Sequence, residues 1–306
     1  MTMDVNAVLV QMIVLFLLVI AGFLSRKCKL MSVEFDKKFS NLVIQLTSPC
    51  LILASTMGDK MPDRHLILPL LGVSALTYAI LISVSTYLPR IMPVKKEQRG
   101  MYSFMLTFAN VGFIGYPIVA SIFGHSSIFY ACILNVPNTL TIFIWGVMFV
   151  KGSKAGAFDW HLLFSPAMIA TYLSVIIVVC GWKAPSCIAQ PLTMLGNMTV
   201  PASLLVIGSS IAGMPLKRMT GNMGIYIMCV LRLLIIPVTM YYLISALQVD
   251  HLVAAINAVI VGMPVASFGT MFCMKYEKDV TVMAQGTFLS TLLSVLSIPL
   301  LAFLIS

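Results

Sequence analysis

The chain has 306 residues, of which 60% are hydrophobic and only 9% charged, and its formal net charge is +9. Its mean hydropathy is +1.02, whereas a typical soluble chain is about half apolar and a quarter charged. Because so few polar side chains cannot cover a surface in water, the composition excludes a soluble enzyme, a nucleic-acid-binding protein and a disordered protein.

Ten apolar segments are long enough to cross a bilayer, which takes about twenty mostly apolar residues in a helix. In chain order they are residues 5–24, 39–57, 66–88, 100–123, 128–150, 165–182, 189–212, 223–247, 252–274 and 280–304. The loops between them are short. We therefore predict an all-α membrane protein, a single domain within the lipid bilayer, without a cofactor and without a nucleic-acid partner.

The basic residues predict the orientation of these segments, because cytoplasmic loops carry an excess of Lys and Arg. With the N-terminus outside, only Lys60, Arg64 and Lys183 lie in outer loops. Fifteen basic residues then lie in inner loops: Arg26, Lys27, Lys29, Lys37, Lys38, Arg90, Lys95, Lys96, Arg99, Lys151, Lys154, Lys217, Arg218, Lys275 and Lys278. We expect a cell-membrane protein with both termini on the outer side.

Two proline-centred motifs recur in the second half of the chain. The motif TSP (47–49) is followed 152 residues later by TVP (199–201), and GYP (115–117) is followed 147 residues later by GMP (262–264). Two matches in order at nearly one spacing predict two five-helix repeats. An odd number of helices inverts the second repeat, an arrangement typical of secondary transporters. The expected repeats are residues 1–150 and 151–306.

The fourth and ninth segments carry the strongest helix-breaking signals. Proline removes a backbone donor and clashes with the preceding turn, and glycine weakens a helix further. A helix that begins after such a break directs N–H groups and a positive dipole end toward the middle of the membrane. Although a lone Gly-x-Pro is typical of a kink, the duplication favours two crossing breaks that bind a carboxylate. The predicted site residues are Asn110, Gly112, Gly115, Pro117, Gly262 and Pro264.

Six stretches together resemble the auxin efflux carrier family, within the bile/arsenite/riboflavin transporter superfamily. They are ANVGFIGYPIVASIFG, LFSPAMIA, VPASLLVIGSSIAG, LRLLIIP, GMPVASFGTMFCMKYEKD and FLSTLLSVLSIPLL. The family includes plant auxin exporters and bacterial permeases for small dicarboxylates. The resemblance implies ten helices in two inverted repeats, with helices 4 and 9 crossing at Pro117 and Pro264. Residues 151–164 replace the long central loop of many plant members, which favours a bacterial-type carrier.

Charged residues are nearly absent from the predicted spans. All ten acidic residues lie in loops or at span ends, so a proton relay through a carboxylate inside the membrane is not predicted. Arg232 is the only basic residue well inside a span. It either attracts the negative charge of a substrate or extends its long stem to the inner interface. We favour the second, structural interpretation.

The fifth segment contains a polar cluster around Asn135 and Asn138. Their spacing of three residues places both amides on one face of a helix. Such side chains either line a cavity or form hydrogen bonds between helices. Both alternatives stay open, and we include both residues among the candidate substrate-binding residues.

The function predicted from these features is secondary transport of a small organic acid by alternating access. The chain has no GxxxxGK[ST] loop for nucleotide, which argues against direct use of ATP. A ligand sensor on the same fold is the alternative, although the short loops offer little signalling surface. An enzyme is not predicted, because the sequence contains neither HExxH nor GxSxG. A homodimer is left open.

Overall fold

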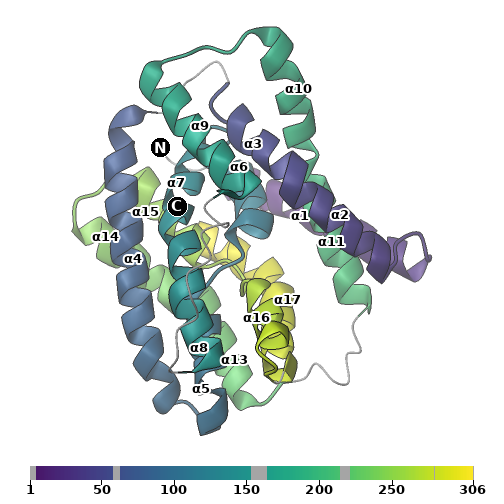
Figure 1. The fold of residues 1–306 in the computed structure, drawn as a ribbon, viewed down its shortest axis with the longest axis vertical. Coiled ribbons are helices and arrows are strands. Elements are labelled where there is room, and N and C mark those ends of the chain that lie inside the picture. Colours follow the sequence, from purple (N-terminus) through teal and green to yellow (C-terminus); the bar gives the residue numbers. More distant parts are fainter. Residues whose placement is uncertain (1–4, 58–62, 153–163, 214–220, 279, 306) are drawn as a thin grey trace.

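The computed structural model describes residues 5–57, 63–152, 164–213, 221–278 and 280–305 (Figure 1). Throughout these residues the regular structure is helical, apart from one isolated antiparallel bridge between Ala109 and Val265. The predicted all-α class is therefore confirmed.

Each of the ten predicted segments coincides with one helix or with a run of helical pieces. In chain order these are α1 (Val5–Lys27); α2 (Val33–Leu42), η1 (Val43–Thr47) and α3 (Ser48–Ala54); η2 (Arg64–Leu66), α4 (Ile67–Tyr87) and η3 (Leu88–Arg90); η4 (Lys96–Gln98), α5 (Arg99–Thr107), η5 (Val111–Gly115) and α6 (Tyr116–Phe123); α7 (Ser127–Thr141), η6 (Ile142–Gly146) and α8 (Val147–Lys151); α9 (Pro166–Cys180); α10 (Ser186–Asn197) and α11 (Thr199–Gly213); α13 (Met223–Val230), η8 (Leu231–Ile235) and α14 (Ile236–Ala246); α15 (His251–Val261) and α16 (Phe268–Lys275); and α17 (Val280–Leu304).

Within the described ranges, four continuous helical stretches are long and apolar enough to cross a membrane: Arg64–Arg90, Ser186–Ser209, Met223–Ala246 and Val280–Leu304. A fifth is formed if Ser127–Thr141 and Ile144–Lys151, which are bent by 43°, make one span. Other predicted spans are short or interrupted; α9, for example, has 15 residues. The chain is thus a multi-pass membrane protein, and the count of ten crossings stays a prediction.

The helices form two groups that are each packed mainly within themselves. In the first bundle, α1 lies along α11, and α3 packs against α9 and α10. In the second bundle, α4 packs on α7, α14 on α15, and α13 on α17. Figure 1 shows α1, α2 and α11 on the right of the molecule and α4, α14 and α15 on the left. A seam therefore runs between the bundles.

Two glycines bring α1 and α11 into backbone contact. A Cβ atom at Gly22 would lie 2.1 Å from the carbonyl oxygen of Leu205, and one at Gly208 would lie 1.9 Å from that of Val19. Small residues at such positions let membrane helices approach closely, and packing of this kind is what holds them together in lipid. The first bundle therefore depends on both glycines.

We expect Gly208→Ala to destabilise the purified protein by about 1–3 kcal/mol, since the added methyl group must push the two helices apart. The measurement is the midpoint of thermal unfolding in detergent. Gly72→Ala is the matched control, because a Cβ atom at Gly72 in α4 meets nothing within 4 Å. Equal midpoints for the two variants would show that the close contact of α1 and α11 contributes nothing to stability.

Candidate functional site

The break in the fourth predicted segment lies at Phe108–Asn110, where the backbone is extended between α5 and η5. Pro117, seven residues further on, lies in the first turn of α6 and follows η5 without interruption. The π-helical turn of η5 shifts the hydrogen-bond pattern before the proline, so its missing N–H is tolerated there. The expectation that this helix is broken at Pro117 is therefore wrong.

The break in the ninth predicted segment contains its proline. It spans Gly262–Ser267, between the end of α15 and the start of α16, with Pro264 in its middle. A proline after a helix end ensures that the helix cannot continue. Here the position inferred from the sequence and the position in the structure agree.

The two breaks pair with each other, and we call their paired residues, 108–110 and 262–267, the crossover. The N–H of Asn110 donates to the carbonyl oxygen of Pro264 at 2.9 Å. The N–H of Ala266 donates to the carbonyl oxygen of Phe108 at 3.0 Å. Extended backbone inside a membrane needs such partners, because lipid supplies none. Backbone N–H and C=O groups of each break therefore find hydrogen-bond partners in the other break.

The side chains of Asn110 and Ser267 meet at the crossover. The Nδ2 atom of Asn110 donates to the Oγ atom of Ser267 at 3.2 Å, and both residues keep accessible surface. Each precedes a helix start, η5 for Asn110 and α16 for Ser267. The first N–H groups of a helix lack partners within it and carry partial positive charge. An amide, a hydroxyl and two helix starts together suit a carboxylate.

Ser267 was not among the predicted site residues, although the sequence held a signal for it. The letters VAS occur shortly after both Pro117 and Pro264, ending in Ser121 and Ser267. Only the second serine lies at the crossover, since Ser121 donates back to Pro117 within α6. The same letters therefore have different roles in the two segments.

The three glycines of the predicted site lie at or beside the crossover, in different surroundings. A Cβ atom at Gly112 would meet nothing within 4 Å, so the backbone there borders open space. One at Gly115 would lie 3.4 Å from Cγ of Met263, in the opposite break. One at Gly262 would lie 2.6 Å from Cδ2 of Leu301. Gly112 is thus the one of these three glycines that borders open space.

Arg232 lies next to the crossover and is only 1% exposed. Its Nη1 donates to the carbonyl oxygen of Leu106 at 2.7 Å, and its Nε donates to that of Met263 at 3.1 Å. The interpretation that its stem reaches the inner interface is therefore wrong. Two backbone acceptors hold the guanidinium inside the protein, and the sequence of η8 contains no sign of them.

The polar cluster of the fifth predicted segment, Asn135 and Asn138, is connected to α6 by a hydrogen bond. Asn138 donates through Nδ2 to Oδ1 of Asn135 at 2.9 Å, and Asn135 donates through Nδ2 to the hydroxyl of Tyr116 at 3.0 Å. Tyr116, which was not among the predicted site residues, is buried at the start of α6. The cluster therefore links α7 to α6, the helix that follows the crossover, by a hydrogen bond between helices.

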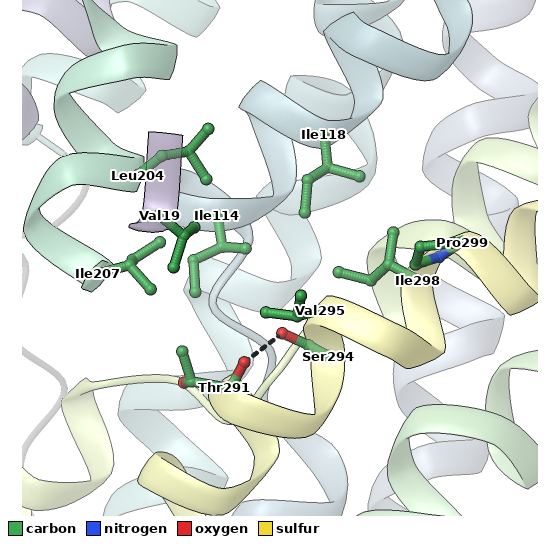
Figure 2. Close-up of a pocket in the computed structure, with 10 residues that line it drawn as sticks. All are labelled: Val19, Ile114, Ile118, Leu204, Ile207, Thr291, Ser294, Val295, Ile298 and Pro299. Carbon is green, nitrogen blue, oxygen red and sulfur yellow. Dashed lines mark hydrogen bonds between the residues drawn. The ribbon is translucent and has the colours of Figure 1, made fainter. Parts of the chain in front are cut away.

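A cavity of about 50 Å³ opens on the seam between the bundles, one turn beyond Asn110 (Figure 2). Its lining residues are Val19, Ile114, Ile118, Leu204, Ile207, Thr291, Ser294, Val295, Ile298 and Pro299. The N–H of Ile114 donates to the carbonyl oxygen of Asn110, so this lining residue lies one helical turn from Asn110. The hydroxyls of Thr291 and Ser294 donate within α17. The cavity therefore presents an almost wholly apolar wall beside the polar pair.

Comparison with known families decides the class of the protein. A family model described as "Membrane transport protein" matches residues 7–158 and 154–302. The chain belongs to this family. Its members are membrane transporters and not enzymes.

Relatives of this membrane transport protein cover most of its length. It is 25% identical over 300 residues to an uncharacterized transporter of Methanocaldococcus jannaschii, covering 94% of this chain and 96% of that protein. It is also 25% identical over 297 residues to an uncharacterized transporter of Methanothermobacter thermautotrophicus, covering 92% and 93%. A "Putative malonate transporter" of Rhizobium meliloti is 21% identical over 218 residues, 67% of each chain.

Proposed function

We propose that this membrane transport protein is a secondary transporter that moves a small organic anion by alternating access at the crossover. The observation that carries the proposal is the pair Asn110–Ser267, which stands accessible between two helix starts. A carboxylate there accepts hydrogen bonds from the amide and the hydroxyl. Its carbon skeleton then lies toward the apolar cavity that begins at Ile114.

The distribution of charge supports an anion as the substrate. Among the described hydrogen bonds and ion pairs, none brings a carboxylate to the crossover. Asp36 is buried but belongs to a separate contact, where Oδ2 accepts from Arg26 at 3.4 Å and from Ser209 at 2.6 Å. A negatively charged substrate therefore meets no like charge at the site. The relative named for malonate is in keeping with this class.

The seam between the two bundles supports alternating access. The crossover belongs to the second bundle, whereas α1 and α11 of the first bundle form the opposite wall of the cavity. A relative movement of the bundles opens the site to one side and closes it to the other. We propose that two inverted five-helix repeats, residues 1–150 and 151–306, make the outward-open and inward-open states related by symmetry. We also propose that the membrane potential, worth about 2.3 kcal/mol per charge at 100 mV, favours export of the anion.

Transport by purified protein in proteoliposomes tests the function. A panel of radiolabelled short organic acids, malonate among them, is offered with and without an imposed membrane potential. We expect saturable movement of at least one acid, absent from protein-free liposomes. Ligand-induced thermal stabilisation without any movement of the same acids would contradict transport and support a sensor.

We also propose that both termini face outward, which predicts a specific labelling pattern. Single cysteines at positions 95–99, in the predicted inner loop, should resist a membrane-impermeant thiol reagent in intact cells and react after permeabilisation. A single cysteine at Arg64, in a predicted outer loop, should react in intact cells. The reverse pattern would invert the orientation, and with it the assignment of the inner face.

A further inference from the structure

Arg232 carries a charge that no carboxylate balances in the described structure. It is the second residue of η8, deep in the second bundle, and almost completely buried. The two ion pairs of the described residues, Arg26–Asp36 and Lys38–Glu34, lie elsewhere. A buried charge without compensation is strongly unfavourable. Something other than a carboxylate must therefore stabilise this guanidinium.

Its two acceptors supply part of that stabilisation, because they lie at or just beyond helix C-terminal ends. Leu106 is in the last turn of α5, and Met263 follows the end of α15 by two residues. The last carbonyl groups of a helix lack partners within it, and each helix end carries roughly half a negative charge. Together these two carbonyl groups offset part of the guanidinium charge, and its Nη2 atom is buried without a hydrogen-bond partner among the described residues. The positive ends of η5 and α16 are left for the substrate.

We propose that Arg232 is a positioning residue that joins the two broken helices into one unit and keeps the crossover in register. Nε bonds to Met263 in the break after α15, and Nη1 bonds to Leu106 in the last turn of α5, so a single side chain sets the distance between α5 and the end of α15. That distance keeps Asn110 opposite Ser267. The substrate site in this statement is the one of the proposed function, on which the inference rests.

The geometry requires arginine and not simply a positive charge. The guanidinium is planar and presents its donors in a rigid fork, whereas the lysine ammonium is a single point at the end of a flexible stem. Lysine at position 232 therefore keeps the charge but lacks two donors at a fixed spacing, so it cannot hold both carbonyl groups in the same positions. A residue that only attracted the substrate would tolerate lysine. Arg232→Lys therefore distinguishes the two roles: it disrupts a residue that positions the crossover and is tolerated by one that only attracts the substrate.

Hydrogen exchange at the crossover tests the positioning role without any substrate. In the full-length protein, Arg232→Lys and Arg232→Gln should both speed exchange of the Asn110 and Ala266 amides, roughly ten- to hundred-fold for the loss of a charged hydrogen bond. Exchange in α1 and α11 should not change. Arg90→Gln is the control, because Arg90 is exposed and stacks on Tyr87. Unchanged exchange at both amides in the two Arg232 variants would overturn the proposal.

A disulfide across the crossover provides the second test. Ala109 and Val265 form a non-hydrogen-bonded antiparallel pair, flanked by the two backbone hydrogen bonds. Such pairs have Cα atoms about 4.5 Å apart, within the range of a disulfide. Ala109→Cys with Val265→Cys is combined with Arg232→Gln, and the exposed Cys28, Cys180 and Cys187 are replaced by serine.

We expect the oxidised staple to restore both slow amide exchange and organic-acid transport to the Arg232→Gln protein, and reduction to abolish both. Restored protection without restored transport would overturn the positioning role and assign the guanidinium to the substrate itself. If the wild-type protein moves no organic acid at all, the proposed function fails, whereas the exchange experiment still decides what Arg232 holds together.

Discussion

Replacing Asn110 with alanine should weaken organic-acid binding about ten- to hundred-fold. The variant loses the Nδ2 donor that now bonds to Ser267, and with it a hydrogen bond to the substrate carboxylate. A hydrogen bond to a charged group contributes roughly 1.5–3 kcal/mol, and each 1.4 kcal/mol corresponds to about a factor of ten in affinity. Isothermal titration of purified, monodisperse protein measures the change. Ser267→Ala should have an effect in the same direction.

Asn257→Ala is the matched control for the loss of an asparagine. Asn257 lies in α15, where its side chain exchanges hydrogen bonds with Thr77 of α4 at 3.1 and 3.3 Å, and both residues are buried. Removing it should lower the unfolding temperature and leave affinity unchanged. If Asn257→Ala weakened binding as much as Asn110→Ala does, the loss would reflect general loosening of the fold and the crossover would not be the site.

Replacing Pro264 with alanine should reduce transport tenfold or more. Proline inside a helix is unfavourable by about 3 kcal/mol, so alanine makes extension of α15 through the break correspondingly easier. Extension would withdraw the Pro264 carbonyl oxygen from the N–H of Asn110 and remove the bridge. Initial rates in proteoliposomes, at matched amounts of folded protein, measure the loss.

Pro117→Ala and Pro49→Ala are the controls for Pro264→Ala. Both prolines lie in the first turn of a helix, α6 and α3, where a missing N–H is tolerated. Both variants should transport at close to the wild-type rate. Transport lost in Pro117→Ala but kept in Pro264→Ala would restore the earlier expectation that Pro117 opens the fourth helix.

The sequence by itself determined the class of the protein and the positions of its helices. Segments such as 66–88 and 280–304 became α4 and α17 with ends that differ by at most one residue. Local composition suffices for this, because the transfer of a side chain into lipid depends on its own polarity and little on its neighbours in space. Pro264 marked its break correctly for a similarly local reason.

Only the tertiary structure decided what the crossover is made of. The break at Phe108–Asn110 persists because backbone groups more than 150 residues away satisfy it, and no local pattern encodes those partners. The partners of Arg232 are likewise two carbonyl oxygens, which every residue possesses. Pro117 was a misleading signal, since the π-helical turn η5 precedes it and the helix continues through the proline without a break. Hydrogen bonds between distant backbone segments therefore placed the site, and hydrophobicity placed the helices that carry it.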